Sequence, residues 1–376
     1  MIRLERRLQQ PRWLSIAVPF GSVAVAFAVS AILLAATGHN PAQTFGKLFT
    51  EAFLSTSALS ATLTTATPLA FTGLAAAAAF RMRLFNIGGE GQLYAGAIAS
   101  MAAGLALGGV SGPLAIFLMV LAGCAGGALW ALIPGLLRAF LSTNEIIVSL
   151  MLNYVAGLIL NFLIFDSFSY WRDTSTADAR VFPQGRMLDA DAMWPALHLG
   201  SVTVPLGLLL GIGGAIGLAG LYNRTRFGFE VRVLADSERA ATYSGIRVRR
   251  SILAVMAISG AIAGLGGASQ SGDFRYSLDP RGLGQAGYGY AGIVVAALGR
   301  YNPYLVVLLA FLLGGLQNAG YALQGADFPS GLVGVIQGVI LFCALGGELF
   351  VRYRPRLVRR GGARAGAAAS SGEPRP

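Results

Sequence analysis

Long apolar runs recur along almost the whole chain, and this pattern restricts the folds that the chain can adopt. Most runs contain about 20 residues with hardly a charged side chain, which is the length that a helix needs to cross a bilayer. Only 12% of all residues are charged, whereas about a quarter are charged in a typical soluble domain. Because backbone polar groups inside lipid must be satisfied within the chain, such runs form helices. The sequence therefore predicts an all-α protein, a polytopic membrane helical bundle.

The distribution of arginine between the runs predicts how many of them cross the membrane. We delimit ten runs: 14–36, 53–80, 87–107, 113–137, 146–165, 201–222, 251–269, 286–299, 303–323 and 330–350. Arginine gathers before the first run, at Arg81 and Arg83, at Arg138, within 223–250, at Arg300 and after the last run, whereas the alternate loops are neutral or balanced by acidic residues. Cytoplasmic loops carry an excess of Lys and Arg, so about 10 transmembrane helices with the N-terminus and the C-terminus both cytoplasmic satisfy every loop. Run 286–299 is short for a full crossing, and we expect a bent or partly unwound segment there.

The same pattern divides the chain into three parts. Residues 1–13 form a cytoplasmic N-terminal segment, 14–350 form the transmembrane domain, and 351–376 form a basic, disordered cytoplasmic tail. Within the transmembrane domain, 166–200 is an external loop and 223–250 is a cytoplasmic loop. The first run is longer than the roughly 7–15 apolar residues of a signal peptide, so we expect it to remain as the first span.

Polar residues occur in the segment that joins the second and third runs, where the membrane leaves little room for a loop. Asn86, Glu90 and Gln92 lie there together with three glycines. An unsatisfied polar group in lipid costs several kcal/mol, so such side chains are usually buried between helices or face a wet path. A short, solvated turn at the cytoplasmic edge is the alternative. Asn153 in the fifth run is open to two interpretations, contact between helices or lining of a path.

Small-xxx-small spacings predict where helices pack closely. Gly123 and Gly127 in the fourth run have this spacing, as do Gly260 and Gly264 in the seventh. Small residues at such positions let two helix backbones approach each other. We therefore interpret these glycines as packing positions.

Motifs for catalysis, nucleotide binding and metal binding are missing or lack their usual context. Two matches to the dinucleotide pattern G-x-G-x-x-G, at 282–287 and 287–292, follow no predicted strand, and the pattern G-x-x-x-x-G-K-[ST] does not occur. The two cysteines and the two histidines lie far apart in the sequence, so we expect no metal site. The net charge of +11 follows the loops, which favours a topology signal over nucleic acid binding. We expect no catalytic residue, no cofactor and no nucleic acid partner.

The loop 223–250 is too long and too patterned for a simple turn. Its arginines alternate with Glu230, Asp236 and Glu238, and its apolar residues fit one face of a short amphipathic helix. These apolar residues are Val231, Val233, Leu234, Ala240, Ala241, Tyr243 and Ile246. Such a helix on the cytoplasmic side is a docking surface, either for membrane lipid or for a partner protein.

Four stretches of the chain contain distinctive motifs. They are FNIGGEGQ at 85–92, TNEII at 143–147 with MLNY at 151–154, RFGF at 226–229 with ERAATYSGI at 238–246, and ALGRYNP at 297–303. These stretches resemble the signatures of one family, the bacterial ABC import permeases of the nucleoside and simple-sugar branch, which is ribose-type and branched-chain-amino-acid-like. The third stretch is similar to that family's coupling loop, a relative of the EAA segment that fits into the ATPase subunit. The resemblance extends from about residue 50 to residue 350, and the long external loop is typical of the nucleoside-type branch.

The resemblance implies a transport subunit without a catalytic site of its own. It would be a permease in the bacterial inner membrane that moves a small neutral polar solute, a nucleoside or a simple sugar, by alternating access. Its partners would be an ABC ATP-binding subunit that holds ATP and Mg, a second homologous permease subunit in a heterodimer, an external solute-binding protein or lipoprotein, and membrane lipid. The residues expected to shape or support the substrate path are Asn86, Glu90, Gln92, Asn144, Glu145 and Asn153. The residues expected to couple to the ATPase are Phe227, Gly228, Glu238, Arg239, Ala240, Ala241 and Gly245.

An ion-gradient-driven secondary transporter of small polar solutes is the main alternative. Such carriers usually place a carboxylate or a histidine near the membrane midplane to couple ion and cargo. Here every acidic residue lies in a loop or near the end of a predicted span. The sequence therefore favours the ATP-driven class.

Overall fold

The computed structural model describes residues 2–6, 12–108, 110–166, 169–175, 177–324 and short stretches between 334 and 357. The chain divides into two units, 1–39 with 338–376 and 40–337. The smaller unit contains helix α1 (Arg12–Ala36) and the strands β1 (Ile2–Arg6) and β4 (Tyr353–Leu357), which pair antiparallel with Ile2 opposite Leu357. β4 lies within the segment 351–376 that the sequence indicates as a tail, and the rest of that segment lies outside the described residues.

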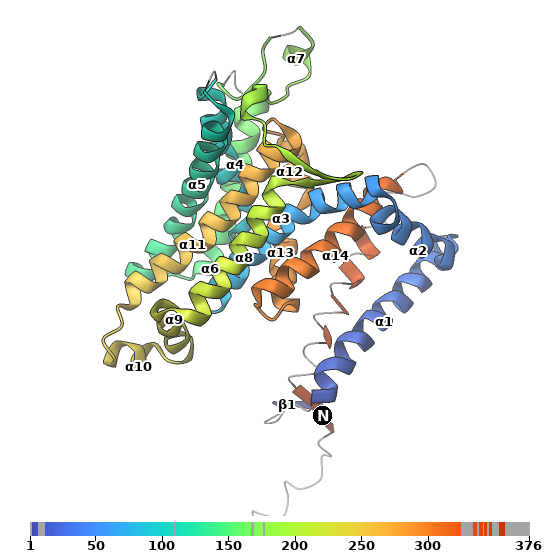
Figure 1. Cartoon of the computed structure of the whole chain (residues 1–376). Coiled ribbons are helices and arrows are strands. Elements are labelled where there is room, and N and C mark those ends of the chain that lie inside the picture. Colours follow the sequence, from blue (N-terminus) through green and yellow to red (C-terminus); the bar gives the residue numbers. More distant parts are fainter. Residues whose placement is uncertain are drawn as a thin grey trace, which may run out of the picture. The chain divides into compact units, whose positions relative to one another are not determined.

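Helices build most of the larger unit, as the sequence predicts (Figure 1). Its α-helices are α2 (Pro41–Phe49), α3 (Thr56–Phe80), α4 (Gly89–Ala106), α5 (Gly112–Leu141), α6 (Glu145–Asn161), α7 (Ala177–Val181), α8 (Leu206–Arg224), α9 (Arg226–Asp236), α10 (Glu238–Tyr243), α11 (Val248–Ser269), α12 (Pro280–Ala286), α13 (Tyr288–Leu298) and α14 (Pro303–Ala322). The π-helical turns η1 (Thr50–Leu54), η2 (Phe162–Asp166) and η4 (Gln270–Arg275) continue α2, α6 and α11, and η3 (Ala190–Ala192) is a short 3-10 turn. Strands β2 (Ala196–Leu199) and β3 (Val202–Pro205) form an antiparallel hairpin just before α8, with Ala196 opposite Pro205.

Six helices in the described part of the chain are long and apolar enough to cross a membrane. They are α3, α5, α6 with η2, α8, α11 with η4, and α14, and a seventh is added if Ala24–Ala36 and Pro41–Leu54 form one broken span. The predicted third run is α4, with 18 residues, and the predicted eighth run is α13, whose 11 residues are too few for a complete crossing. Much of the predicted tenth run, 330–350, lies outside the described residues. The total of about ten spans and the side of each terminus stay predictions.

Backbone contacts at glycines hold the centre of the larger unit together. A Cβ added at Gly127 of α5 would lie 2.2 Å from the carbonyl oxygen of Gly260 on α11, and one added at Gly264 would lie 2.2 Å from that of Gly123. The small-xxx-small prediction is therefore confirmed for this helix pair. Helix α4 approaches the same site, because a Cβ at Gly96 would lie 2.3 Å from the Cα of Gly264. Helix α3 passes beside α11, and its residues 66–80 are all buried.

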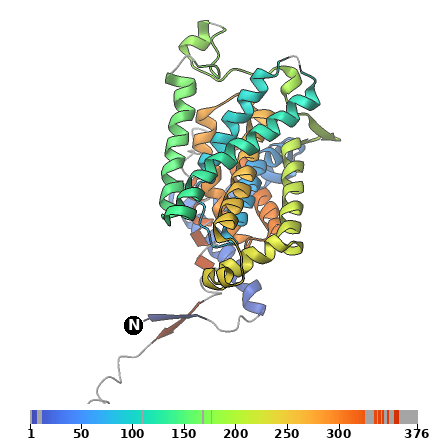
Figure 2. The ribbon, with the colours of Figure 1, turned by 90° about the vertical axis from the view of Figure 1, so that its left-hand side faces the viewer.

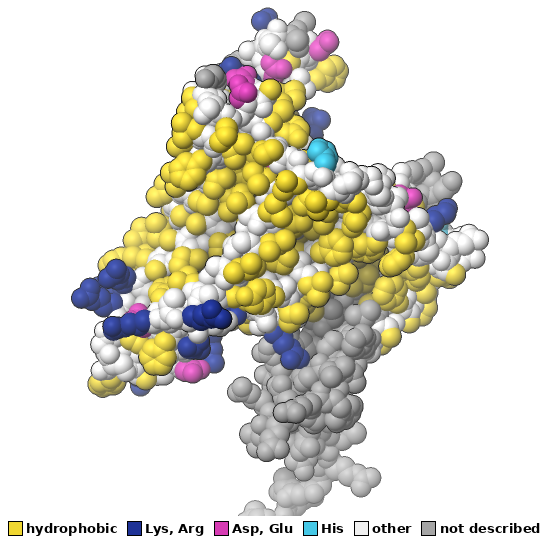
Figure 3. All heavy atoms as spheres, viewed as in Figure 1, with side chains coloured by type: hydrophobic (Ala, Val, Ile, Leu, Met, Phe, Trp, Pro, Cys, Tyr) yellow, Lys and Arg dark blue, Asp and Glu magenta, His cyan; other side chains and the backbone are white. Residues whose placement is uncertain are grey.

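The surface of the larger unit is apolar along its sides and charged at its two ends. Figure 3 shows apolar side chains over α5, α8 and α11, with Lys and Arg gathered near α9 and α10. Phe117, Leu129 and Leu158 are 61%, 66% and 69% exposed, as expected for side chains that face lipid. Helices α9 and α10 lie at one end of the bundle and α7 lies at the other (Figures 1 and 2).

Candidate functional site

A buried network of amides connects the polar segment 85–92 to the core helices. Asn86 Nδ2 donates to Gln92 Oε1 at 3.0 Å, and Gln92 Nε2 donates back to Asn86 Oδ1 at 2.9 Å. Asn86 Nδ2 also donates to Ser259 Oγ on α11 at 2.9 Å, and this hydroxyl donates to the carbonyl oxygen of Ala75 on α3 at 2.8 Å. Asn86 and Gln92 are 2% and 1% exposed. The alternative of a solvated turn is therefore wrong for these two residues.

Glu90 joins the first turns of two helices that are far apart in the sequence. Its carboxylate accepts from Tyr94 Oη at 2.6 Å and from the backbone N–H of Gly289. Glu90 is 3% exposed and lies in the first turn of α4, whereas Gly289 lies in the first turn of α13. A Cβ at Gly289 would lie 2.3 Å from the backbone nitrogen of Glu90, so only glycine allows this approach. We call the contact of these two helix starts the helix-start junction.

Asn153 of α6 also forms hydrogen bonds with residues of the helix-start junction. Its Oδ1 accepts from the backbone N–H of Gly91 at 2.8 Å, and its Nδ2 donates to the carbonyl oxygen of Ile87 at 2.9 Å and to Tyr290 Oη at 3.4 Å. These contacts agree with the first interpretation of Asn153 from the sequence, contact between helices, and lining of a path stays a prediction. The partners of Asn153 come from the segment before α4, from α4 and from α13.

The other two predicted path residues lie at the first turn of α6. Asn144 is the N-cap of α6, is exposed, and accepts from the backbone N–H of Ile146 at 3.0 Å. Glu145 is buried, accepts from the backbone N–H of Phe85 at 3.4 Å and pairs with Arg138 Nε at 3.5 Å. The structure thus groups five of the six residues around segment 85–92 and leaves Asn144 at the surface.

The loop 223–250 contains two short helices, which corrects the prediction of a single amphipathic helix. Thr225 caps α9 by accepting from the backbone N–H of Gly228, and Ser237 caps α10 by accepting from that of Ala240, both at 3.3 Å. A helix break at Ser237 turns the apolar residues in different directions. Val231, Leu234 and Ala241 are buried, whereas Ala240 is exposed and Tyr243 is 94% exposed.

The exposed residues of α10 include Glu238, Arg239, Ala240 and Tyr243. We call these four the docking surface after the role that the sequence predicts for them. Of the other predicted coupling residues, Phe227 and Gly228 lie against Tyr222 of α8, and Ala241 and Gly245 lie within or just after α10. Phe227 packs its ring 6.1 Å from that of Tyr222, Ala241 is fully buried, and Gly245 has a φ of 78°, which favours glycine. A Cβ at Gly228 would lie 2.1 Å from the carbonyl oxygen of Tyr222.

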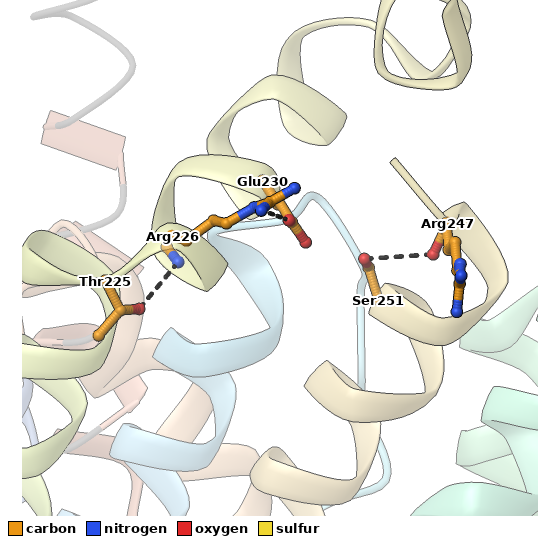
Figure 4. A network of polar contacts seen from close by, with 6 residues as sticks. Thr225, Arg226, Glu230, Arg247 and Ser251 are labelled. Carbon is orange, nitrogen blue, oxygen red and sulfur yellow. Dashed lines mark hydrogen bonds and ion pairs between the residues drawn. The ribbon is translucent and has the colours of Figure 1, made fainter. Parts of the chain in front are cut away.

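A basic pocket of about 590 Å³ separates α9 from the start of α11. Figure 4 shows Arg226 and Glu230 of α9 on one side, paired at 3.0 Å, and Arg247 and Ser251 on the other side. Arg250 also lines this pocket, so its lining includes three guanidinium groups and one carboxylate. This excess of positive charge favours an acidic side chain or another anion as the group that enters it.

Comparison with known proteins identifies the family. The family model for the permease component of branched-chain amino acid transport systems matches residues 58–345, which is most of the chain. The chain belongs to this permease family. It is 34% identical over 369 residues to the glucose ABC transporter permease protein TsgB13 of Haloferax volcanii, which covers 94% of this chain and 93% of that relative.

Two further relatives are similar to this permease. It is 31% identical to the nucleoside ABC transporter permease protein NupB of Lactococcus lactis, over 86% of this chain and 89% of the relative. It is 32% identical to the guanosine ABC transporter permease protein NupP of Bacillus subtilis, over 86% of this chain and 91% of the relative. The resemblance predicted from the four sequence stretches is confirmed. The permease is a multi-pass membrane protein and a transport component of an ABC importer, and family membership implies an ATP-binding subunit.

Sequence reasoning missed the partner of Glu90 in the permease. The stretch 287–292 was interpreted as a false dinucleotide motif within the short run 286–299, yet its Gly289 lies against Glu90 of α4 and its Gly292 against Thr72 of α3. Gly287 has a φ of 57° and begins an 11-residue helix, so the short Gly-rich run was the available signal. The contact of this run with the Glu90 carboxylate depends on packing between Glu90 and Gly289, which lie 199 positions apart in the sequence.

Replacing Asn86 should destabilise the permease. Asn86→Ala leaves the buried Gln92 amide without its reciprocal partner, which costs about 1–3 kcal/mol for an unsatisfied buried group. We expect a clearly lower melting temperature of the purified chain in detergent. The matched control is Asn161→Ala, because Asn161 is exposed and, among the residues that the structure describes, its amide donates only to the carbonyl oxygen of Gly157 in its own helix. Equal melting temperatures of the two variants would contradict the described network.

Proposed function

We propose that this permease moves a small neutral polar solute, a nucleoside or a simple sugar, across a bacterial inner membrane. The match of the family model over residues 58–345, with relatives named for glucose, nucleoside and guanosine, carries this proposal. The same relatives support an ATP-driven importer over an ion-gradient-driven carrier. A path with few charges suits an uncharged cargo, because an unpaired charge inside a membrane protein is costly.

The importer that we propose has further subunits. A second homologous permease completes the path as a heterodimer, ATP-binding subunits hold ATP and Mg in the cytoplasm, and an external solute-binding protein or lipoprotein delivers the cargo. In this arrangement α9 and α10 lie on the cytoplasmic side and the segment 166–200 lies outside. The exposed α10 surface and the basic pocket beside α9 supply a suitable contact for an ATP-binding subunit, while lipid surrounds the apolar sides.

The docking helices are connected to the core by a short series of contacts, which supports a role in coupling. Arg232 Nη1 of α9 donates to the carbonyl oxygen of Tyr222 at 3.0 Å, and Tyr222 Oη donates to that of Ala78 on α3 at 2.9 Å. We propose that nucleotide binding shifts α9 and α10, that α8 and α11 follow, and that the path opens to alternate sides. The six predicted path residues then act mainly as supports that hold the path's helices in place.

Transport by the assembled complex tests this proposal. The tagged permease is purified with its neighbours and reconstituted with the binding protein, and uptake of radiolabelled guanosine and of glucose is measured with and without ATP. We expect ATP-dependent uptake of at least one of the two solutes, together with ATPase activity. Uptake that survives ATP depletion and collapses with an uncoupler would contradict the proposal and favour the ion-gradient alternative.

A further inference from the structure

A second pocket, of about 510 Å³, lies at the end of the bundle opposite α9 and α10. We call it the distal pocket, and it is lined by the end of η2, by the segment that follows α7, and by the stretch from η4 to α12. Its volume lies within the range of about 300–1,000 Å³ that is usual for pockets that bind small molecules. The pocket shares no lining residue with the helix-start junction or with the basic pocket.

Backbone contacts fix the walls of the distal pocket. The backbone N–H of Leu188 donates to the carbonyl oxygen of Tyr276 at 2.8 Å, and that of Trp194 donates to the carbonyl oxygen of Gly272 at 3.0 Å. A Cβ at Gly185 would lie 2.3 Å from the carbonyl oxygen of Leu278, so the loop lies directly on the stretch after η4. The loop of the predicted external segment is therefore anchored to the end of α11, and the pocket is preformed.

Aromatic faces and fixed polar groups line the distal pocket together. Phe182 and Phe274 are 74% and 51% exposed, and Arg281 lies with its Cζ 5.1 Å from the centre of the Phe165 ring. Gln184 supplies an exposed amide among these rings. Exposed aromatic faces beside amide donors and acceptors suit a flat ring or a sugar ring with hydroxyl groups, which stacks on one side and forms hydrogen bonds at its edge.

The distal pocket is lined by three charged side chains. Arg275 Nη1 forms an ion pair with Asp279, so the remaining charge is the guanidinium of Arg281 over the Phe165 ring. This guanidinium can donate to the hydroxyl or carbonyl oxygens of an uncharged ring.

Exposed polar groups continue from the distal pocket toward the helix-start junction. Arg281 lies in the first turn of α12, Gln285 near the end of the same helix is exposed, and Tyr290 in the first turn of α13 is 42% exposed. Tyr290 contacts Asn153 at the junction, and Tyr154 beside it on α6 is 64% exposed. Polar groups exposed on a membrane-embedded surface usually face a wet path or a partner subunit.

We propose that the distal pocket is an acceptor site that binds the ring of a nucleoside or simple sugar before the cargo passes along α12 to the helix-start junction. This inference rests on the proposed function, because it assumes that cargo of that class arrives at this end of the bundle. The pocket assigns substrate contact to Phe182, Gln184 and Phe274, which are exposed. It does not assign contact to the buried residues around segment 85–92.

Protection of a cysteine from labelling tests this inference in the complete importer. Gln184→Cys is introduced after Cys124 and Cys343 are replaced by alanine, and right-side-out vesicles are treated with a membrane-impermeant maleimide. Saturating guanosine or glucose, whichever the complex imports, should slow the labelling at least threefold. Val181→Cys is the matched control, because Val181 is 70% exposed on the same loop but does not line the pocket, and its labelling should not change.

A kinetic measurement supplies the second readout. Phe182→Ala should raise the KM for uptake roughly fivefold, which is the size of one lost aromatic stacking contact, and should leave Vmax and ATPase activity unchanged. The control Val181→Ala should change none of these three quantities. Import without protection of Gln184→Cys and without a KM effect would overturn the distal pocket alone. Equal protection of both cysteine variants would also overturn it, in favour of coverage by the binding protein. Failure of the unmutated complex to import either solute would overturn the proposed function and this inference together.

Discussion

Replacing Gly264 by valine should prevent the permease from accumulating as a folded protein. A Cβ at this position would lie 2.2 Å from the carbonyl oxygen of Gly123 and 2.8 Å from the Cα of Gly127. Both obstacles are backbone atoms of α5, so no side-chain rotation relieves them. Overpacking of a core usually costs about 1–3 kcal/mol, and here helix α4 presses on the same site at Gly96, so we expect a cost at or above that range.

The amount of monodisperse protein extracted from membranes measures this effect. Gly264→Val should give less than a tenth of the unmutated level. Gly213→Val is the matched control, because Gly213 is also a helix glycine and a Cβ there has nothing within 4 Å. If both variants accumulate equally, α5 and α11 do not pack as described here.

Replacing Tyr243 by aspartate should abolish most transport without unfolding the chain. Tyr243 is 94% exposed at the end of α10, so its side chain contributes little to the stability of the isolated permease. Under the proposed function it contacts the ATP-binding subunit, and a central aromatic contact of an interface is worth about 2 kcal/mol or more. We expect the affinity for the ATP-binding subunit to fall roughly 30-fold, since about 1.4 kcal/mol corresponds to a factor of ten.

Three measurements separate this effect from misfolding. ATP-dependent uptake and recovery of the ATP-binding subunit in a pulldown should both fall, while the melting temperature of the chain should stay unchanged. Leu199→Asp is the control, because Leu199 is a similarly exposed apolar residue, 70% exposed, on β2 and away from the docking surface. Normal uptake by Tyr243→Asp would show that α10 is not the docking surface.

Local patterns in the sequence predicted those parts of the fold that depend on neighbouring residues. The spacing of Gly123 with Gly127 and of Gly260 with Gly264 identified packing faces, and the structure brings these faces together. The Gly-rich run 286–299 was predicted to be a short span with a bent or partly unwound segment, and its helix α13 has only 11 residues. The family followed from four short stretches, because those combinations of residues recur in its members.

Contacts between distant segments could not be predicted in the same way. Asn86 was expected to be buried between helices or to face a wet path, but its partner Ser259 lies 173 positions away, and no local pattern connects the two. The break at Ser237 was missed because Ser237 lies between two apolar stretches that fit one helix equally well. The distal pocket is composed of three separate segments, at 164–165, 182–185 and 274–281, so its aromatic rings formed no recognisable motif in the sequence.

The contact of α9 with the end of α8 has a consequence for the design of chimeric transporters. Gly228 lies against the carbonyl oxygen of Tyr222, and Arg232 binds that same oxygen, so one atom outside the loop sets the angle of α9. A graft that exchanges only residues 225–245 would separate the donor helix from the residue that orients it. Exchangeable docking modules for this family should therefore begin before Tyr222 and include the last turn of α8.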